Sequence, residues 1–178
     1  MRELLYLQVM RKIKDTMDIE KLDTAELIDA YSRIIIQLKK REIIRTKNLL
    51  GDLAEFLVID HFAKTSYLPN LQSAPAGTKN VDAISRQGER YSIKATSGNL
   101  TGSFWGLNPP GITSLEPQKF EYLIVACFDD NFKLKKILQA SWLSFLENKS
   151  WNKTMECWKI TITKKFIDSC QIIYERVD

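Results

Sequence analysis

The stretch that decides the fold runs from Asn80 to Gly98 and reads NVDAISRQGERYSIKATSG. Two short segments within it, residues 81–86 and 90–96, have the composition of β-strands, and a polar segment with one glycine, residues 87–89, separates them. Two such runs joined by a short glycine-containing loop are typical of a β-hairpin. We therefore predict two antiparallel strands here.

The length of the loop decides which side chains meet across the hairpin. A three-residue loop over residues 87–89 would place Ile84 opposite Ser92 and Asp82 opposite Lys94. A two-residue loop would shift the register by one residue and move Lys94 away from the face of Asp82. Side chains alternate along a strand, so Ser92 and Lys94 share a face in either case. The first register predicts a carboxylate and an ammonium group together at one edge of the sheet.

Helical patterns precede the hairpin, and strand patterns follow it. Helices are expected over residues 2–14, 23–44, 48–64 and 141–149, and strands over residues 120–128, 133–141, 157–163 and 171–176. Asp23 and Glu26 form a capping signal for the second helix, whose apolar residues recur at helical spacing and predict one buried face. The strand over residues 120–128 is apolar throughout, so we expect it at the centre of the sheet. This order predicts an α+β fold, an α/β/α sandwich with a mixed central sheet.

Composition limits the classes of function. The chain has 178 residues and a formal net charge of +4, which predicts one domain: an N-terminal helical segment, 1–46, packed on a core, 47–178. The three cysteines lack the spacing of a zinc site or a disulfide framework. We expect no membrane association and a cytoplasmic location, because no apolar run is long enough for a signal peptide or a membrane span. No glycine-rich phosphate-binding motif occurs, so no nucleotide cofactor is expected.

Glu55 stands out within the helix expected over residues 48–64. Its neighbours Leu53, Ala54, Phe56 and Leu57 are apolar, and apolar residues surround most of this helix, which predicts packing on several sides. Burying a carboxylate as an ion costs several kcal/mol unless a cation or a metal ion meets it. A helix glutamate, a strand aspartate and a strand lysine that converge would form a metal site with a built-in positive charge.

The trio of Glu55 in GDLAEFLV, Asp82 in NVDAI and Lys94 in YSIKA resembles the PD-(D/E)XK nuclease superfamily, the fold of many restriction endonucleases. In that family an aspartate begins the hairpin, an acid-x-Lys triplet follows about ten residues later, and an acidic residue on the preceding helix completes the site. The resemblance covers about residues 47–128. This sequence departs from the pattern in having Val81 before Asp82 and Ser92 in place of the acid of the triplet.

The resemblance implies a restriction endonuclease-like core and a Mg²⁺-dependent deoxyribonuclease. It assigns Glu55, Asp82 and the main-chain carbonyl of Ile93 as metal ligands, because Mg²⁺ prefers oxygen ligands. Lys94 would orient the attacking water and offset negative charge at the phosphate, and Ser92 would contact the metal ion through a water. The expected reaction leaves a 5′-phosphate and a 3′-hydroxyl. Because one site cuts one strand, the resemblance also implies a homodimer.

The segment after Lys94, residues 95–111, is the candidate contact with double-stranded DNA. It is rich in Gly, Ser, Thr and Asn, which offer hydroxyls and backbone N–H groups to phosphates, and it contains two aromatic residues that could contact bases. The candidate DNA-binding residues are Thr96, Ser97, Asn99 and Trp105. The alternative is a plain surface loop whose aromatic side chains fold back onto the core.

Two other functions remain open. Because Ser92 replaces an acid, the protein could be a nuclease-fold DNA-binding protein or an inactive partner subunit. Asp82 and Lys94 could also form only a salt bridge in a scaffold or regulatory protein, since cross-strand ion pairs are common and contribute roughly 0.2–1 kcal/mol.

Overall fold

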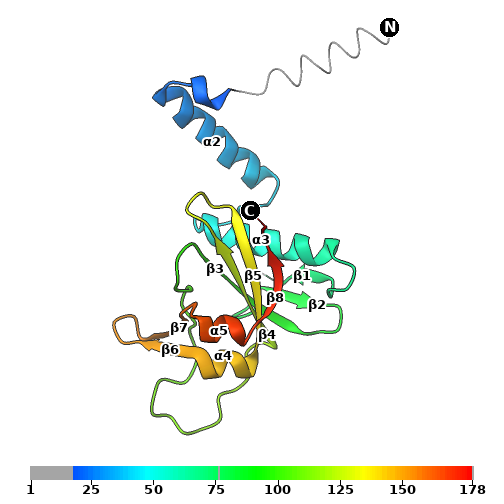
Figure 1. The fold of residues 1–178 in the computed structure, drawn as a ribbon, viewed down its shortest axis with the longest axis vertical. Helices are drawn as coiled ribbons and strands as arrows, with labels where there is room; N and C mark the ends of the chain where they lie inside the picture. The colour runs from blue at the N-terminus through cyan, green and yellow to red at the C-terminus, as the bar shows by residue number, and fades with distance from the viewer. Residues whose placement is uncertain (1–17, 76, 178) are drawn as a thin grey trace. The chain divides into compact units, whose positions relative to one another are not determined.

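The computed structural model describes residues 18–75 and 77–177 and divides the chain into two compact units, Met1–Ile44 and Arg45–Asp178 (Figure 1). The boundary between them in the sequence, between residues 44 and 45, lies two residues before the predicted boundary between residues 46 and 47. The helix predicted over residues 2–14 lies outside the described residues. Among the helices that the structure describes, none is both long and apolar enough to cross a membrane.

The described part of the first unit consists of a 3₁₀ turn, η1 (Ile19–Lys21), and a helix, α2 (Thr24–Lys40). The predicted cap is confirmed: Asp23 accepts from the Glu26 backbone N–H at 2.9 Å, and the Glu26 carboxylate accepts from the Asp23 N–H at 2.9 Å. The predicted burial of the apolar face is wrong for most of its residues. The exposed fractions are 40% for Leu27, 62% for Ile28, 60% for Tyr31 and 47% for Ile34.

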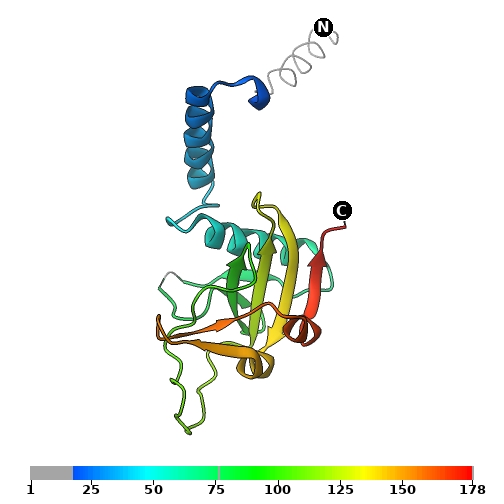
Figure 2. The same ribbon diagram turned by 60° about the vertical axis from the view of Figure 1, so that its left-hand side comes forward.

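The second unit is built on a mixed six-stranded sheet with the order β1-β2-β3-β4-β5-β8 (Figure 2). Its strands are β1 (Leu71–Ser73), β2 (Ala83–Ser85), β3 (Arg90–Thr96), β4 (Tyr122–Phe128), β5 (Leu134–Ser141) and β8 (Gln171–Glu175). The pair β3 and β4 is parallel, and the other neighbours in this sheet are antiparallel. The predicted central strand is confirmed, since β4 is a largely buried strand with neighbours on both sides.

Helices cover both faces of the sheet, which confirms the predicted α+β class. On one face α3 (Leu49–Lys64) packs through Ala54, Val58 and Phe62 in a core with side chains of β1 and β3. The other face packs against α4 (Trp142–Asn148), α5 (Lys164–Asp168) and the two-stranded sheet of β6 (Lys149–Asn152) and β7 (Cys157–Ile160). Each face therefore has its own hydrophobic core.

Several local predictions fail where elements are short. The short elements η1, β1, β6 and α5 were not predicted. The strand predicted over residues 157–163 is β7, which pairs with β6 outside the main sheet. Packing of α3 on several sides is incomplete at Phe56, which is 41% exposed, while residues 49–55 and 57–62 are buried or half-buried. The remaining elements were predicted within a few residues of their observed bounds.

A buried carboxylate fixes the chain where it enters α3. Asp52 is 4% exposed, and its Oδ2 accepts from the backbone N–H groups of Arg45 at 2.8 Å and Thr46 at 2.6 Å. The Thr46 hydroxyl donates to the same oxygen at 3.0 Å. An acidic side chain in the first turn also interacts favourably with the positive end of the helix dipole. Asp52 therefore sets the path of the backbone that carries Arg45.

We expect Asp52→Ala to lower the free energy of unfolding by about 1–3 kcal/mol, because it removes the acceptor of two part-buried backbone N–H groups and of the Thr46 hydroxyl. Chemical denaturation of the variant measures this loss. The matched control on the same helix is Asp60→Ala, which removes an exposed ion pair with Lys64 and should cost less than about 1 kcal/mol. Equal losses in the two variants would contradict the anchoring role of Asp52.

Candidate active site at the edge of the sheet

The hairpin forms with a register two residues away from the predicted one. Ala83 pairs with Tyr91, and the loop closes between Ser85 and Glu89, whose N–H to O distance is 2.9 Å. The backbone N–H of Asp82 therefore donates to the carbonyl of Tyr91, and the predicted pairing of Asp82 with Lys94 is wrong. A shift of two residues keeps every side chain on its predicted face. Lys94 lies one step further along that face and still reaches Asp82.

Asp82 lies where strand pairing ends. Its backbone N–H donates to the Tyr91 carbonyl at 2.8 Å, and the ladder between β2 and β3 stops at this point. Its side chain continues the pairing in place of the backbone, because Asp82 Oδ2 accepts from the Ile93 N–H at 2.6 Å. A residue in an antiparallel ladder points its N–H and C=O to the same side. The carbonyl oxygen of Ile93 therefore faces the same gap beside β3.

Lys94 and Ser92 contact the same carboxylate. The distance from Lys94 Nζ to Asp82 Oδ2 is 3.7 Å, and both side chains are about three-quarters buried. The Lys94 ammonium also lies 5.4 Å from the centre of the Phe104 ring. Ser92 is fully buried, and its hydroxyl donates to Asp82 Oδ2 over a long 3.4 Å. A carboxylate at position 92 would be buried beside Asp82, so the neutral side chain avoids a repulsive pair.

Glu55 approaches this edge from α3. Burial raises the pKa of its carboxyl group, and the negative charge of Asp82 raises it further. Arg45, which forms an ion pair with Glu55, lowers this pKa, and Lys94 lowers it to a smaller extent. The cation expected beside Glu55 is thus Arg45. Two carboxylates and two cations influence one another at the open end of β2.

The donors at this edge fit a hard divalent cation. The carboxylates of Asp82 and Glu55 and the Ile93 carbonyl supply oxygen ligands, and oxygen is the ligand that Mg²⁺ prefers. A cation would also relieve the repulsion that raises the pKa of Glu55. The set holds two carboxylates, and no group of three His, Cys, Asp or Glu side chains is placed to hold a metal ion among residues 18–75 and 77–177.

Glu55→Gln should raise stability at neutral pH. The pKa of Glu55 is raised above its ordinary value of 4.5, so the stability linked to this group is fully present below pH 4.5 and is lost as the pH rises through the folded-state pKa. The amide of glutamine does not ionise, so the variant does not lose stability in this way as the pH rises. Thermal unfolding in a chelator between pH 4 and pH 8 should show the variant gaining over wild type as the pH rises.

The control for this measurement is Glu147→Gln on the exposed side of α4, which should follow wild type at every pH. A Glu55→Gln variant that is less stable than wild type at neutral pH would contradict the prediction. It would mean that the ion pair with Arg45 outweighs the cost of burying the carboxylate.

The candidate DNA-binding residues occupy different environments after β3. Thr96 is buried, and its hydroxyl donates to the Leu100 carbonyl at 2.9 Å, so it holds the turn together. Ser97 and Asn99 are exposed, and Trp105 is 54% exposed. Three of the four side chains are therefore available at the surface.

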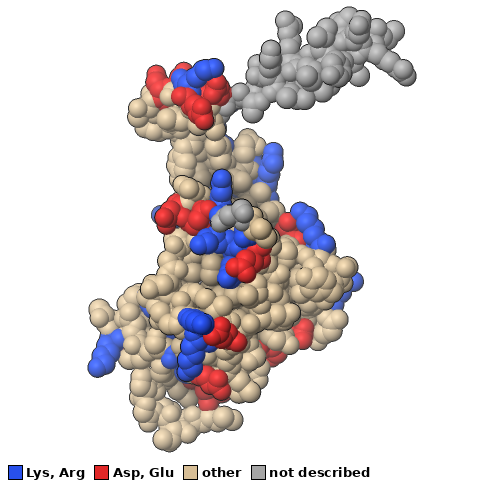
Figure 3. All heavy atoms as spheres, in the orientation of Figure 1, with Lys and Arg blue, Asp and Glu red and all other residues tan. Residues whose placement is uncertain are grey.

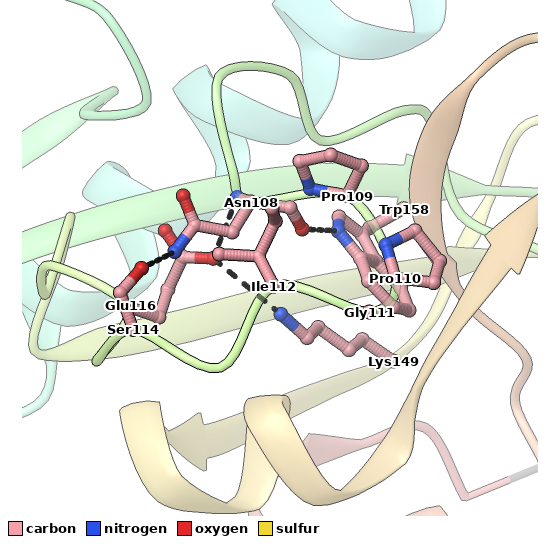
Figure 4. A pocket seen from close by; sticks show the side chains of 9 residues that line it. All are labelled: Asn108, Pro109, Pro110, Gly111, Ile112, Ser114, Glu116, Lys149 and Trp158. Carbon is pink, nitrogen blue, oxygen red and sulfur yellow. Dashed lines mark hydrogen bonds and ion pairs between the residues drawn. The ribbon is translucent and has the colours of Figure 1, made fainter.

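The loop that follows Trp105 is fixed by a nearly buried ion pair that the sequence analysis missed. Glu116 Oε2 accepts from the Asn108 N–H at 2.7 Å and lies 3.8 Å from Lys149 Nζ (Figure 4). Trp158 donates its indole N–H to the Asn108 carbonyl at 2.9 Å, and the Lys149 ammonium lies 4.2 Å from its ring centre. Burial lowers the pKa of Lys149. These contacts surround a cavity of about 250 Å³ and hold the loop against β6 and β7.

A second cavity, of about 470 Å³, has a basic lining. Its walls include Ser97 after β3, Lys135 and Lys136 at the start of β5, and Glu175 and Arg176 at the end of β8. Lys136 pairs with Glu175 at 2.7 Å. Figure 3 shows Lys and Arg side chains near the C-terminal end of the chain, with acidic side chains beside them. The lining therefore holds three cations and one carboxylate.

Neither a protein-family model nor a curated protein matches this sequence. The proposed function therefore rests on the residues gathered around Asp82, at the open end of β2.

Proposed function

We propose that this protein is a Mg²⁺-dependent deoxyribonuclease of the restriction endonuclease type, which hydrolyses phosphodiester bonds in double-stranded DNA. The observation that carries the proposal is the contact between Lys94 Nζ and Asp82 Oδ2 at 3.7 Å. Glu55 belongs to the same group, because Asp82 raises the pKa of its carboxyl group and Lys94 lowers it. Carboxylates that bind a divalent cation, next to a lysine that contacts the reacting phosphate, suit this reaction.

Each residue of the proposed site would have a separate role. Asp82, Glu55 and the Ile93 carbonyl would hold the ion, which supplies Lewis-acid polarisation of a phosphate oxygen and activates a water. The Lys94 ammonium would donate hydrogen bonds to the attacking water and the phosphate, which orients the water and offsets the negative charge that develops. Ser92 would hold Asp82 in place through its hydroxyl. Ser97 and the lysines of the basic cavity would contact neighbouring phosphates.

A second candidate is a DNA-binding protein that does not cut. Two observations favour it: Ser92 is a neutral residue at a position where the resembling family has an acid, and Arg45 already pairs with Glu55. Such a protein would use the same basic surface and bind DNA with a strong dependence on salt. The two candidates differ in a single measurable property, which is metal-dependent cleavage.

Cleavage of mixed plasmid and linear DNA in Mg²⁺ and in Mn²⁺ tests the first candidate. Asp82→Asn and Lys94→Met should each lower the cleavage rate by at least about 100-fold, because each removes a group that stabilises charge at the phosphate. Lys153→Met, in the exposed turn between β6 and β7, is the charge-matched control and should cut like wild type. Mg²⁺ should also raise the melting temperature of the wild type, and Asp82→Asn should abolish this rise.

The outcomes separate the candidates. Binding of DNA by wild type without cleavage in either metal ion would reject the nuclease and support the binding protein. Cleavage that survives both substitutions would come from another site or a contaminant and would overturn the assignment. A protein that neither binds nor cuts DNA would leave the Asp82 and Lys94 pair as a structural salt bridge.

Salt dependence of DNA binding tests the basic cavity. Ser97 lies three residues beyond Lys94, about 10 Å along the strand, so the cavity could hold a phosphate near the one at Lys94. Lys135→Ala should reduce the slope of log K against log salt concentration by about 1, and adding Lys136→Ala should reduce it by about 2 in total. Fluorescence anisotropy with a labelled duplex in Ca²⁺ measures the slope. Unchanged slopes, or an equal change in Lys153→Ala, would place the DNA elsewhere.

A further inference from the structure

The helix α2 has an apolar stripe that the described residues of its own unit, 18–44, leave largely exposed. Leu27, Tyr31, Ile34 and Leu38 are spaced by four, three and four residues, which is the repeat that forms a seam between two helices. Three of these four side chains are at least 40% exposed. An apolar stripe of this length on a water-soluble helix marks a surface that packs against another element.

Charges beside the stripe are divided between the two ends of the helix. Asp23 and Glu26 lie at its N-terminal end, and Lys40 and Arg41 lie at its C-terminal end. With about 100° of rotation per residue, Asp23, Glu26 and Arg41 fall on the same side of the stripe, and Lys40 lies further round the helix. Two antiparallel copies would bring this side of one helix against the same side of the other, so acidic and basic ends would meet. In a parallel pair, like charges would lie at the same end.

We infer that α2 is a self-association surface that pairs antiparallel with α2 of a second copy of this chain. A two-fold axis between residues 32 and 33 would place Leu27 opposite Leu38 of the partner and Tyr31 opposite Ile34 of the partner. The pairing is then the same for both copies, as a two-fold interface requires. The seam runs along a helix about 25 Å long.

This inference does not depend on the proposed nuclease activity, because it rests on the stripe and the charges of α2 alone. The two proposals also fail separately, since mass in solution reports on pairing and cleavage reports on the site around Asp82. If both hold, the dimer supplies two sites, one for each DNA strand.

Sedimentation equilibrium of the full chain over a wide range of concentrations tests the pairing. Wild type should be dimeric, and Ile34→Glu should raise the dissociation constant by at least about 100-fold, because it buries an unpaired charge in the seam. The control is Ile36→Glu, since Ile36 is 50% exposed and lies on the opposite side of α2 from Ile34. It should leave the dissociation constant unchanged. Circular dichroism would check that both variants keep their helices.

The double variant Lys40→Gln with Arg41→Gln tests the direction of pairing. It should weaken an antiparallel dimer by about tenfold at low salt, because it removes the partners of Asp23 and Glu26. A parallel dimer would instead become tighter, because repulsion between the basic ends is removed. A tighter variant, a wild type that is monomeric throughout, or equal dissociation by Ile34→Glu and Ile36→Glu would each overturn the inference.

Discussion

The hydrogen bond from the Ile93 N–H to the Asp82 carboxylate, 2.6 Å long, is the contact on which the candidate site depends. It lies just beyond the last backbone pair of β2 and β3. The Asp82 carboxylate there accepts the hydrogen bond that a backbone carbonyl of a longer strand would accept. If β2 began two residues earlier, backbone groups could fill this edge and the carboxylate would have no backbone donor to bind. Because β2 is short, Asp82 is fixed by its own backbone and by its side chain, and Lys94 meets a carboxylate that cannot swing away.

The charges around Asp82 are set by a chain of contacts that starts outside the hairpin. Buried Asp52 holds the backbone of Arg45, and Arg45 pairs with Glu55 on the next turn of α3. The negative charge of Asp82 in turn raises the pKa of Glu55, and each of these carboxylates has a basic partner. The two cations offset the two acids, which allows carboxylates to stay together in a partly buried site without a metal ion. A divalent cation entering this site would compete with Arg45 for Glu55.

Local signals in the sequence predicted the elements, while tertiary packing decided what they contact. The capping residues Asp23 and Glu26 and the apolar run of β4 act within a few residues, so they could be read directly. The hairpin register was missed because the loop is residues 86–88, with Gly88 last and at a φ of +86°. Three-residue loops commonly end in a residue with positive φ, so the glycine carried the signal.

Other parts of the site had no signal in the sequence. Periodicity shows which face of α2 is apolar, but it cannot show what covers that face. Arg45 and Glu55 are ten residues apart, and Glu116 and Lys149 are 33 residues apart, so both ion pairs depend on the path of the chain between elements. Asp82, Ser92 and Lys94 could be grouped in advance because a strand places alternate residues on one face. Short-range geometry thus located the hairpin residues, and only the folded chain supplied their partners.

The surroundings of Lys94 are set by the connection between β3 and β4 as much as by the sheet. Its ammonium lies over Phe104, and Phe104 pairs with Trp158 of β7 through two backbone hydrogen bonds of 2.8 and 3.2 Å. Trp158 also holds Asn108, which the Glu116 carboxylate fixes from the other side. The β6–β7 sheet therefore supports Lys94 indirectly, through Phe104 in the segment that follows β3. The Phe104 ring and the Asp82 carboxylate are thus two contacts of the ammonium, and the proposed contact with a phosphate would need such a fixed geometry.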